Sequence, residues 1–183
     1  MAQEGEAGQA GRVGSARAPA PVKKVGLNVI GLISDTHGLL RPEAVSALAG
    51  VDLILHAGDI GTSEVLEQLR SLGPVVAVRG NNDRGDWAKA IAEREVTQVG
   101  SVCIYMLHDL NEIDVSPLAA GFQVVVSGHS HQPLIEKREG VLFVNPGSAG
   151  PRRFRLPVSV ARLVIEGSSA RGEVVQLALP PGS

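Results

Sequence analysis

The sequence predicts an α/β domain whose strands end at a common rim lined with polar and acidic side chains. In the first half, short apolar runs alternate with segments of helical spacing, and most of these runs are followed by Asp, Asn or His. Such alternation favours a parallel sheet with right-handed crossovers. A chain of 183 residues is long enough for one domain with a substantial core, expected at residues 25–183 after a flexible tail at residues 1–24.

The first half of the domain is expected to contain three strands separated by two helices. Pro42 suits the first position of a helix, where a backbone N–H is not needed. Thr62 can cap the second helix and Gly73 can end it. The expected strands are residues 25–34, 52–56 and 75–78, and the expected helices are residues 42–49 and 62–72.

The second half has the pattern of antiparallel strands. Gly100-Ser101 lies between two apolar runs, which is a hairpin signal, and a glycine-containing turn separates a later pair of runs. The expected hairpins are residues 96–99 with 102–107 and 134–137 with 141–144, followed by an antiparallel pair at 158–165 and 173–179. A buried strand is expected at residues 122–127 and a brief helix at residues 116–120.

Composition and charge exclude several classes of function. The net charge of −2 gives no basic field for long nucleic acids, and an aromatic content of 3% argues against base stacking. Cys103 is the single cysteine, so an intrachain disulfide and a multi-cysteine metal site are excluded. No apolar stretch approaches the roughly 20 residues that cross a bilayer, and residues 1–21 lack the apolar core of a signal peptide. We therefore expect a cytoplasmic protein.

Four of the five histidines belong to an ordered series of polar motifs. Histidine, carboxylate and amide side chains together are typical of transition-metal sites. Because ligands of open α/β sheets bind beyond the carboxyl ends of strands, one rim can collect all these groups. The series is Asp35-Thr36-His37-Gly38, Gly58-Asp59, Gly80-Asn81-Asn82-Asp83, His108 and Gly128-His129-Ser130-His131. In extended chain, the spacing of two residues in Asp35/His37 and in His129/His131 would put each pair on one side.

Each motif also has a purely structural interpretation. Asp59 can cap the helix that follows it, and Asn and Gly at residues 80–83 are typical of a tight turn. His108 can be a hydrogen-bonded histidine of the core, and His129 and His131 can have structural roles as well. A metal centre is favoured by the conjunction of the motifs in order, each after a strand.

Taken together, the motifs resemble those of the calcineurin-like metallophosphoesterase superfamily, in particular its small YfcE-type phosphodiesterase branch. The resemblance extends over about residues 25–179 and includes the tract from Val144 to Ser148. It implies an α/β/β/α sandwich of two sheets with metals at the strand rim.

The resemblance also implies which residues hold metal. One ion would bind Asp35, His37, Asp59 and His131, and a second ion would bind Asp59, Asn81, His108 and His129, with Asp59 bridging. Such ligands suit Mn²⁺, Fe, Zn²⁺ or Ni²⁺, with Mn²⁺ favoured. Two ions roughly 3.5–4 Å apart would hold a phosphoryl oxygen and a bridging hydroxide that attacks phosphorus in line with the leaving group. The residues expected to take part in catalysis are Asp59, Asn81, Asp83 and His108.

This sequence departs from the family pattern at two positions. Asn82 stands where many members have a histidine that assists the leaving group, so we expect esters with acidic leaving groups to react faster than alkyl esters. Asp83 either replaces that acid or orients a ligand histidine. Asp109 follows His108 where relatives often carry glycine.

Other residues near the motifs have open roles. Arg84, Arg152 and Arg153 can pair with a substrate phosphate, although a solvated surface position is the simpler interpretation for each. His56 is expected to have a structural role rather than to bind metal, and Trp87 either edges the pocket or packs in a loop.

The expected function is a metal-dependent phosphoesterase of the phosphodiesterase type that acts on a small phosphate ester. The alternative is a protein-interaction scaffold on the same fold, as in the retromer subunit that resembles this family. The complete set of expected ligand positions favours the enzyme.

Overall fold

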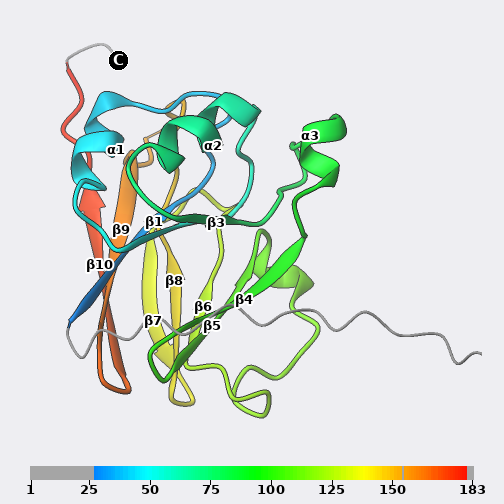
Figure 1. Cartoon of the computed structure of the whole chain (residues 1–183), viewed down its shortest axis with the longest axis vertical. Helices are drawn as coiled ribbons and strands as arrows, with labels where there is room; N and C mark the ends of the chain where they lie inside the picture. Colours follow the sequence, from blue (N-terminus) through cyan, green and yellow to red (C-terminus); the bar gives the residue numbers. More distant parts are fainter. Residues whose placement is uncertain (1–26, 154, 181–183) are drawn as a thin grey trace, which may run out of the picture.

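The computed structural model describes residues 27–153 and 155–180, which form two five-stranded sheets packed face to face (Figure 1). The expected flexible tail at residues 1–24 lies outside the described residues. The α/β/β/α sandwich expected from the sequence is confirmed, with α1 (Pro42–Ala47) and α2 (Ser63–Arg70) on the outer face of the first sheet.

The first sheet combines a parallel half with an antiparallel half in the order β10-β9-β1-β2-β3. The three expected strands of the first half of the chain pair in parallel, with Leu32 opposite Leu55 and Leu55 opposite Val76. The strands are β1 (Asn28–Ile33), β2 (Leu53–His56), β3 (Val75–Ala77), β9 (Ser159–Glu166) and β10 (Ser169–Gln176). The expected antiparallel pair at the end of the chain is β9 and β10.

The second sheet has the order β4-β5-β6-β8-β7. Both expected hairpins are present, and the strands β5, β6 and β8 between them pair in parallel. The strands are β4 (Arg94–Val99), β5 (Val102–Leu107), β6 (Val124–Val126), β7 (Leu134–Arg138) and β8 (Val141–Asn145).

Apolar side chains fill the spaces between the layers. The core between the two sheets includes Leu32, Leu55, Ile104 and Leu163, and each of them is fully buried. A second cluster joins α1 and α2 to the first sheet through residues such as Leu69. The outer face of the second sheet is covered by residues 110–122, so this fourth layer is thin and contains only the short 3₁₀ helix η1 (Leu110–Glu112). Burial of this apolar surface is the main stabilising contribution and fixes how the sheets meet.

Three local expectations differ from the structure. Residues 116–120 form a turn and not a helix, because Gly121 takes a φ of 81° and ends the single set of turn hydrogen bonds. The short helix α3 (Asp86–Lys89) was not expected. Thr62 stands at the cap position of α2, but its side chain makes no capping hydrogen bond.

The register of the parallel strands brings their carboxyl ends to one rim. β1, β2 and β3 end side by side in the first sheet, and β5, β6 and β8 end side by side in the second. Backbone hydrogen bonds link the loops that follow, from Asp35 N–H to the Gly58 carbonyl and from Ala149 N–H to the Ser34 carbonyl. Every polar motif of the sequence is thereby placed in this rim. In the part of the chain that is described, no helix is long and apolar enough to span a membrane.

Candidate metal centre

Asp35 lies at the centre of the rim and is fully buried. Its Oδ2 atom accepts hydrogen bonds from Ser34 Oγ at 2.7 Å and from the His129 backbone N–H at 3.1 Å. Its Oδ1 atom is buried and has no hydrogen-bond partner among the described residues. One oxygen is therefore fixed by the protein, and the other is free to bind a cation.

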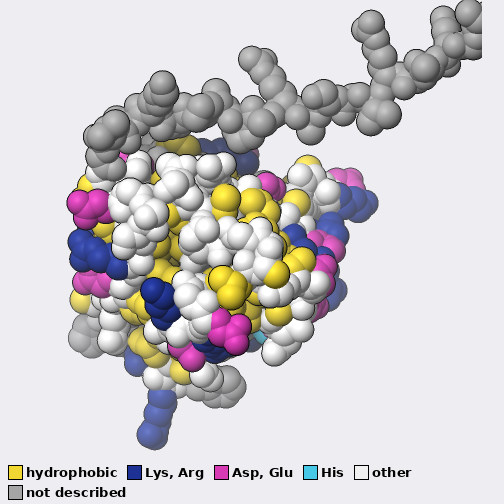
Figure 2. Space-filling model, turned by 90° about the horizontal axis from the view of Figure 1, so that it is seen from below, with side chains coloured by type: hydrophobic (Ala, Val, Ile, Leu, Met, Phe, Trp, Pro, Cys, Tyr) yellow, Lys and Arg dark blue, Asp and Glu magenta, His cyan; other side chains and the backbone are white. Residues whose placement is uncertain are grey.

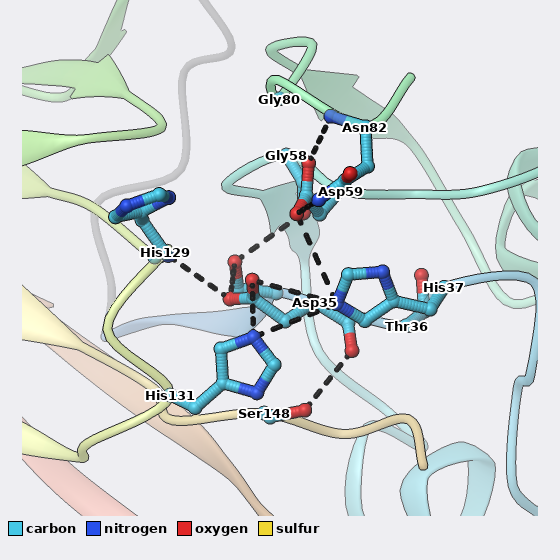
Figure 3. Close-up of polar contacts among 12 residues, drawn as sticks. Asp35, Thr36, His37, Gly58, Asp59, Gly80, Asn82, His129, His131 and Ser148 are labelled. Atoms are coloured by element: carbon cyan, nitrogen blue, oxygen red, sulfur yellow. Dashed lines mark hydrogen bonds and ion pairs between the residues drawn. The ribbon is translucent and has the colours of Figure 1, made fainter. Parts of the chain in front are cut away.

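His37 and His131 face this free oxygen from two different loops (Figure 3). His131 Nε2 lies 3.2 Å and His37 Nε2 lies 3.9 Å from Asp35 Oδ1, and the two Nε2 atoms are 3.5 Å apart. Burial lowers the pKa of His37 below its usual value, against the opposing charges of Asp59 and Asp35. A neutral imidazole is the form that binds metal.

Asp59 faces both groups of histidines with different oxygens. Its Oδ2 lies 3.8 Å from His37 Nε2, and its Oδ1 lies 3.4 Å from His108 Nε2. Although burial acts to raise the pKa of Asp59, the neighbouring His108 ring and two hydrogen bonds from Asn82 hold it well below the usual value. The carboxylate is therefore charged at neutral pH and directed at both sides of the site.

His108 is oriented by a backbone carbonyl. Its Nδ1 atom donates to the carbonyl oxygen of Ala57 at 2.7 Å, which leaves the lone pair of the buried Nε2 atom directed into the site. Burial acts to lower the pKa of His108, but the Asp59 carboxylate, the hydrogen bond to Ala57 and the charge of Asp35 raise it above its usual value.

Asn81 and His129 form the most exposed part of the cluster. The Asn81 Oδ1 atom and the His129 Nδ1 atom are 3.1 Å apart. The ring of His129 lies edge-on to the ring of His108, with 5.2 Å between centroids. Figure 3 shows the ring of His129 apart from Asp35, while its backbone approaches the Asp35 carboxylate.

The backbone is strained at five of these residues. Asp35, His37, Asp59, His129 and His131 all have positive φ values, between 47° and 66°. This conformation is uncommon for residues with a side chain, and such strain is concentrated at functional sites. The sequence argument that each pair shares one side of an extended chain is therefore wrong. Left-handed backbone, and not extended spacing, brings the side chains together.

The donor set fits divalent cations. Two groups of three side chains have ligand atoms within 4.8 Å of one another, Asp35 with His37 and His131, and Asp35 with Asp59 and His108. The unpartnered Asp35 Oδ1 and His108 Nε2 atoms are buried, and a bound cation would satisfy both. Mixed imidazole and carboxylate donors suit transition metals.

The two triads share Asp35, whereas the family resemblance gives the bridging position to Asp59. Ser34 and the His129 backbone already occupy Asp35 Oδ2, so Asp35 has one oxygen left for a cation. Each oxygen of Asp59 accepts one hydrogen bond from Asn82 and retains a second lone pair. Asp59 is thus better suited to bridge two ions.

Several residues that support the ligands were not identified from the sequence. Asn82 donates its backbone N–H to Asp59 Oδ1 at 2.9 Å and its side-chain amide to Asp59 Oδ2 at 2.6 Å (Figure 3). Asn145 donates to the Gly128 carbonyl at 2.6 Å, and Ser148 donates to the Asp35 carbonyl at 3.0 Å. Asn145 and Ser148 belong to the tract 144–148 that is part of the family resemblance, and this tract was the one signal in the sequence for their supporting role.

His56 is completely buried, and both of its ring nitrogens have partners outside the proposed ligand set. Its Nδ1 accepts from the Gly58 backbone N–H at 3.2 Å, so its Nε2 carries the proton and donates to Thr36 Oγ1 at 2.9 Å. Thr36 Oγ1 in turn donates to the Ile60 carbonyl at 2.9 Å. Burial lowers the pKa of His56 to about 3. These contacts are structural, as the sequence predicted.

Asp83 anchors the loop that carries Asn81. Its Oδ1 atom accepts from the Gly61 backbone N–H and its Oδ2 atom accepts from the Gly80 backbone N–H, both at 2.8 Å. With one backbone partner on each oxygen, a positioning role fits this geometry better than delivery of a proton.

One of the three candidate arginines reaches the site. Arg153 Nη2 lies 3.4 Å from His37 Nε2. Its loop is tied to the domain by Arg41, which donates to the Gly150 carbonyl at 3.1 Å. Arg84 and Arg152 are exposed, and Trp87 packs against the cluster under α1 and α2.

Acidic and basic side chains are both exposed on the domain. On the face shown in Figure 2, basic and acidic side chains lie side by side without a continuous basic area.

The sequence matches the family model of the calcineurin-like phosphoesterase superfamily domain over residues 29–168. The chain belongs to this superfamily. It is 37% identical over 163 residues to a probable metallophosphoesterase of Methanothermobacter thermautotrophicus, covering 83% of this chain and 94% of that protein. It is 26% identical over 137 residues to a phosphodiesterase of Methanocaldococcus jannaschii, covering 64% of this chain and 82% of that protein.

Several solved structures share the fold of this chain. A predicted phosphoesterase of Streptococcus pneumoniae has a TM-score of 0.67 at 28% identity, covering 86% of this chain and 95% of its own. Vacuolar protein sorting 29 of Cryptosporidium parvum has a TM-score of 0.71 at 21% identity, covering 86% of this chain and 94% of its own. The phosphoesterase YfcE of E. coli has a TM-score of 0.59 at 20% identity, covering 82% and 100%. The expected resemblance to the calcineurin-like superfamily is confirmed, and YfcE shares the fold.

Proposed function

We propose that this calcineurin-like phosphoesterase is a metal-dependent phosphodiesterase with a dinuclear centre, acting on a small phosphate ester. The observation that carries the proposal is the position of Asp59, whose two oxygens face His37 and His108 separately. A single carboxylate directed at two sets of nitrogen ligands is suited to bridge two cations. The phosphodiesterase among the relatives supports the reaction class.

Seven side chains would hold the two ions. The first ion would bind Asp35, His37, Asp59 and His131, and the second would bind Asp59, Asn81, His108 and His129. When bound, two such ions supply Lewis acidity to a phosphoryl oxygen and an activated water with a pKa of about 7, which is the chemistry of in-line hydroxide attack. We propose Mn²⁺ as the native metal, with Fe, Zn²⁺ or Ni²⁺ as alternatives for the same donors.

The protein's own groups prepare this site in three ways. Asn82 and Ala57 fix the orientations of Asp59 and His108, so little reorganisation is needed when the ions bind. Arg153, next to His37, supplies a guanidinium that can bind a substrate phosphate. Asp83 holds the loop of Asn81 by two backbone hydrogen bonds and is proposed as a positioning residue.

No histidine stands at residue 82 to protonate the leaving group. General acids typically contribute 10²- to 10⁴-fold to such reactions. The proposed enzyme should therefore cleave aryl diesters much faster than alkyl diesters. Equal rates of hydrolysis for a matched aryl and alkyl pair would count against this assignment.

A scaffold role is the second candidate, because a vacuolar protein sorting 29 protein has the same fold. The complete set of seven candidate ligands favours catalysis, since a binding surface has no need for them. We also propose a cytoplasmic location, which fractionation with compartment markers would test.

The test is hydrolysis of bis-p-nitrophenyl phosphate by protein stripped with chelator and then supplied with Mn²⁺. Activity should require the metal and fall by about 10³-fold or more in Asp59→Asn, because the shared ligand would be lost. Asp86→Asn is the matched control, since the Asp86 side chain is exposed on α3 and pairs with Lys89 at the surface. Full activity without metal, or in Asp59→Asn, would overturn the proposal.

A further inference from the structure

The two nitrogens of His129 have different partners. Its Nδ1 atom lies 3.1 Å from Asn81 Oδ1, another proposed ligand of the second ion. Its Nε2 atom lies 3.6 Å from Asp109 Oδ2, an ion-pair distance that is longer than a hydrogen bond. A cation held by Asn81 Oδ1 would therefore meet His129 through Nδ1, while the opposite side of the ring is directed at Asp109.

Asp109 is itself held in place. Its Oδ1 atom accepts from the backbone N–H and from the side-chain amide of Asn111, both at 3.0 Å, and the residue caps the helix η1. These two bonds fix the side chain and leave Oδ2 directed at His129. A carboxylate that is already ordered can orient a second group without a further loss of rotamer freedom.

Of the two histidines proposed to bind the second ion, the fold constrains the ring of His129 less than the ring of His108. His108 is buried, and its Nδ1 atom is fixed by the carbonyl of Ala57 at 2.7 Å. The side chain of His129 is 43% exposed, so packing alone does not set the angle of its ring. The second ion would therefore depend on a contact outside the ligand set.

We propose that Asp109 is a positioning residue for the second metal site and acts through His129. It keeps the proton of His129 on Nε2 and leaves the Nδ1 lone pair for the cation next to Asn81. This role belongs to Asp109 in this chain, at the position after His108. The inference rests on the proposed dinuclear function.

Asp109→Asn is the variant of choice because the amide oxygen can still accept both hydrogen bonds from Asn111. The cap of η1 is kept, while the group facing His129 Nε2 changes from an acceptor to a donor. Glu112→Gln is the matched control, since it removes a carboxylate charge from the same helix. Asp109→Glu restores a carboxylate at the same position.

Binding of Co²⁺ to the full chain, followed by calorimetry and by the visible spectrum of the ion, gives a readout that is independent of activity. In Asp109→Asn, the affinity of one of two sites should fall about 10- to 100-fold, with the other site unchanged. Glu112→Gln should bind as the native protein does, and Asp109→Glu should recover part of the loss.

A double-mutant cycle with His129→Ala tests whether Asp109 acts through His129. In the His129→Ala background, Asp109→Asn should change Co²⁺ affinity no further. Native affinity at both sites in Asp109→Asn, or the same loss with and without His129, would overturn the inference. A native protein that binds fewer than two ions would instead contradict the proposed function.

Discussion

Asp35, His37 and His131 lie in the interior of the strand rim, whereas Asn81 and His129 lie at its edge. The side chain of His131 is 8% exposed and that of His129 is 43% exposed. The interior group is fixed by burial and by the hydrogen bonds on Asp35 Oδ2. The edge group is held by contacts between side chains, including the one with Asp109.

This difference indicates that one proposed ion site is built into the fold, while the other depends on loops that follow β3, β5 and β6. A site supported by rigid strand ends loses little order when its ion leaves, and a site on exposed side chains is more sensitive to small changes. The two sites should therefore differ in affinity and in their response to mutation.

The largest effects are expected for the ligand histidines. His131→Ala should weaken binding of the first ion by more than about 100-fold, because even residues that only orient a metal ligand change metal affinity about 10- to 100-fold. His129→Ala should weaken the second ion only, and it should remove the faster phase of metal release to a chelator. The kinetics of metal release, recorded with a metal indicator, distinguish the two variants. A single phase of release in the native protein would remove the basis of the comparison.

The second largest effect is expected for Gly80→Ala, which should disturb the edge group. A Cβ atom on Gly80 would lie 2.2 Å from Asp59 Oδ1 and 2.3 Å from the Asp59 backbone nitrogen, so the loop of Asn81 and Asn82 would have to move. We expect a loss of about 1–3 kcal/mol in the free energy of unfolding, together with weaker metal binding. Urea unfolding and metal titration measure both. In Gly73→Ala, where the nearest atom is 3.9 Å away, neither quantity should change much.

His56→Leu tests the support beneath the interior group. It leaves the Gly58 N–H without its acceptor, which should cost about 1–3 kcal/mol of stability near neutral pH. The pKa of His56 is about 3 in the folded chain, whereas an unperturbed histidine, as in the unfolded chain, has a pKa of 6.5. As the pH falls, the unfolded chain therefore takes up the proton first. The stability that neutral, buried His56 contributes is therefore complete above pH 6.5 and is lost as the pH falls toward 3.

The native protein and His56→Leu should therefore become more alike in stability as the pH falls through this window. Urea unfolding of the metal-free proteins at several pH values provides the measurement. A difference in stability that is constant with pH would show that His56 titrates normally in the folded chain.

The smallest effect is expected for Arg153→Ala. Arg153 contacts the interior group through His37 but holds no ion in the proposed site. Loss of one charge-assisted contact should raise KM for a diester about 10-fold and leave metal affinity unchanged. Arg152→Ala is the matched control on the adjacent residue. An unchanged KM in Arg153→Ala would remove the arginine from the substrate site.

The sequence predicted the strands and the rim because both depend on local signals. Apolar runs mark β1, β2 and β5, and the polar residue after each run is placed by the parallel register. The pairing of Asp35 with His37 was expected for the wrong reason, since the backbone turns to positive φ at both residues.

The supporting contacts could not be read from the sequence because they depend on loop conformation. Asn82 holds Asp59 and Asp109 faces His129 only because the loops after β3 and β5 bring these residues across the rim. The turn at residues 116–120 was mistaken for a helix because a few helix-compatible residues cannot reveal that Gly121 ends the segment after one turn.

The most direct test of the central claim is the number of metal ions that each chain binds. Elemental analysis after equilibration with Mn²⁺ and removal of free metal should give two ions for the native chain, and fewer for Asp59→Asn, which loses the shared ligand. Equal stoichiometry in both proteins would contradict the bridging role of Asp59, and one ion or none in the native chain would contradict the dinuclear centre.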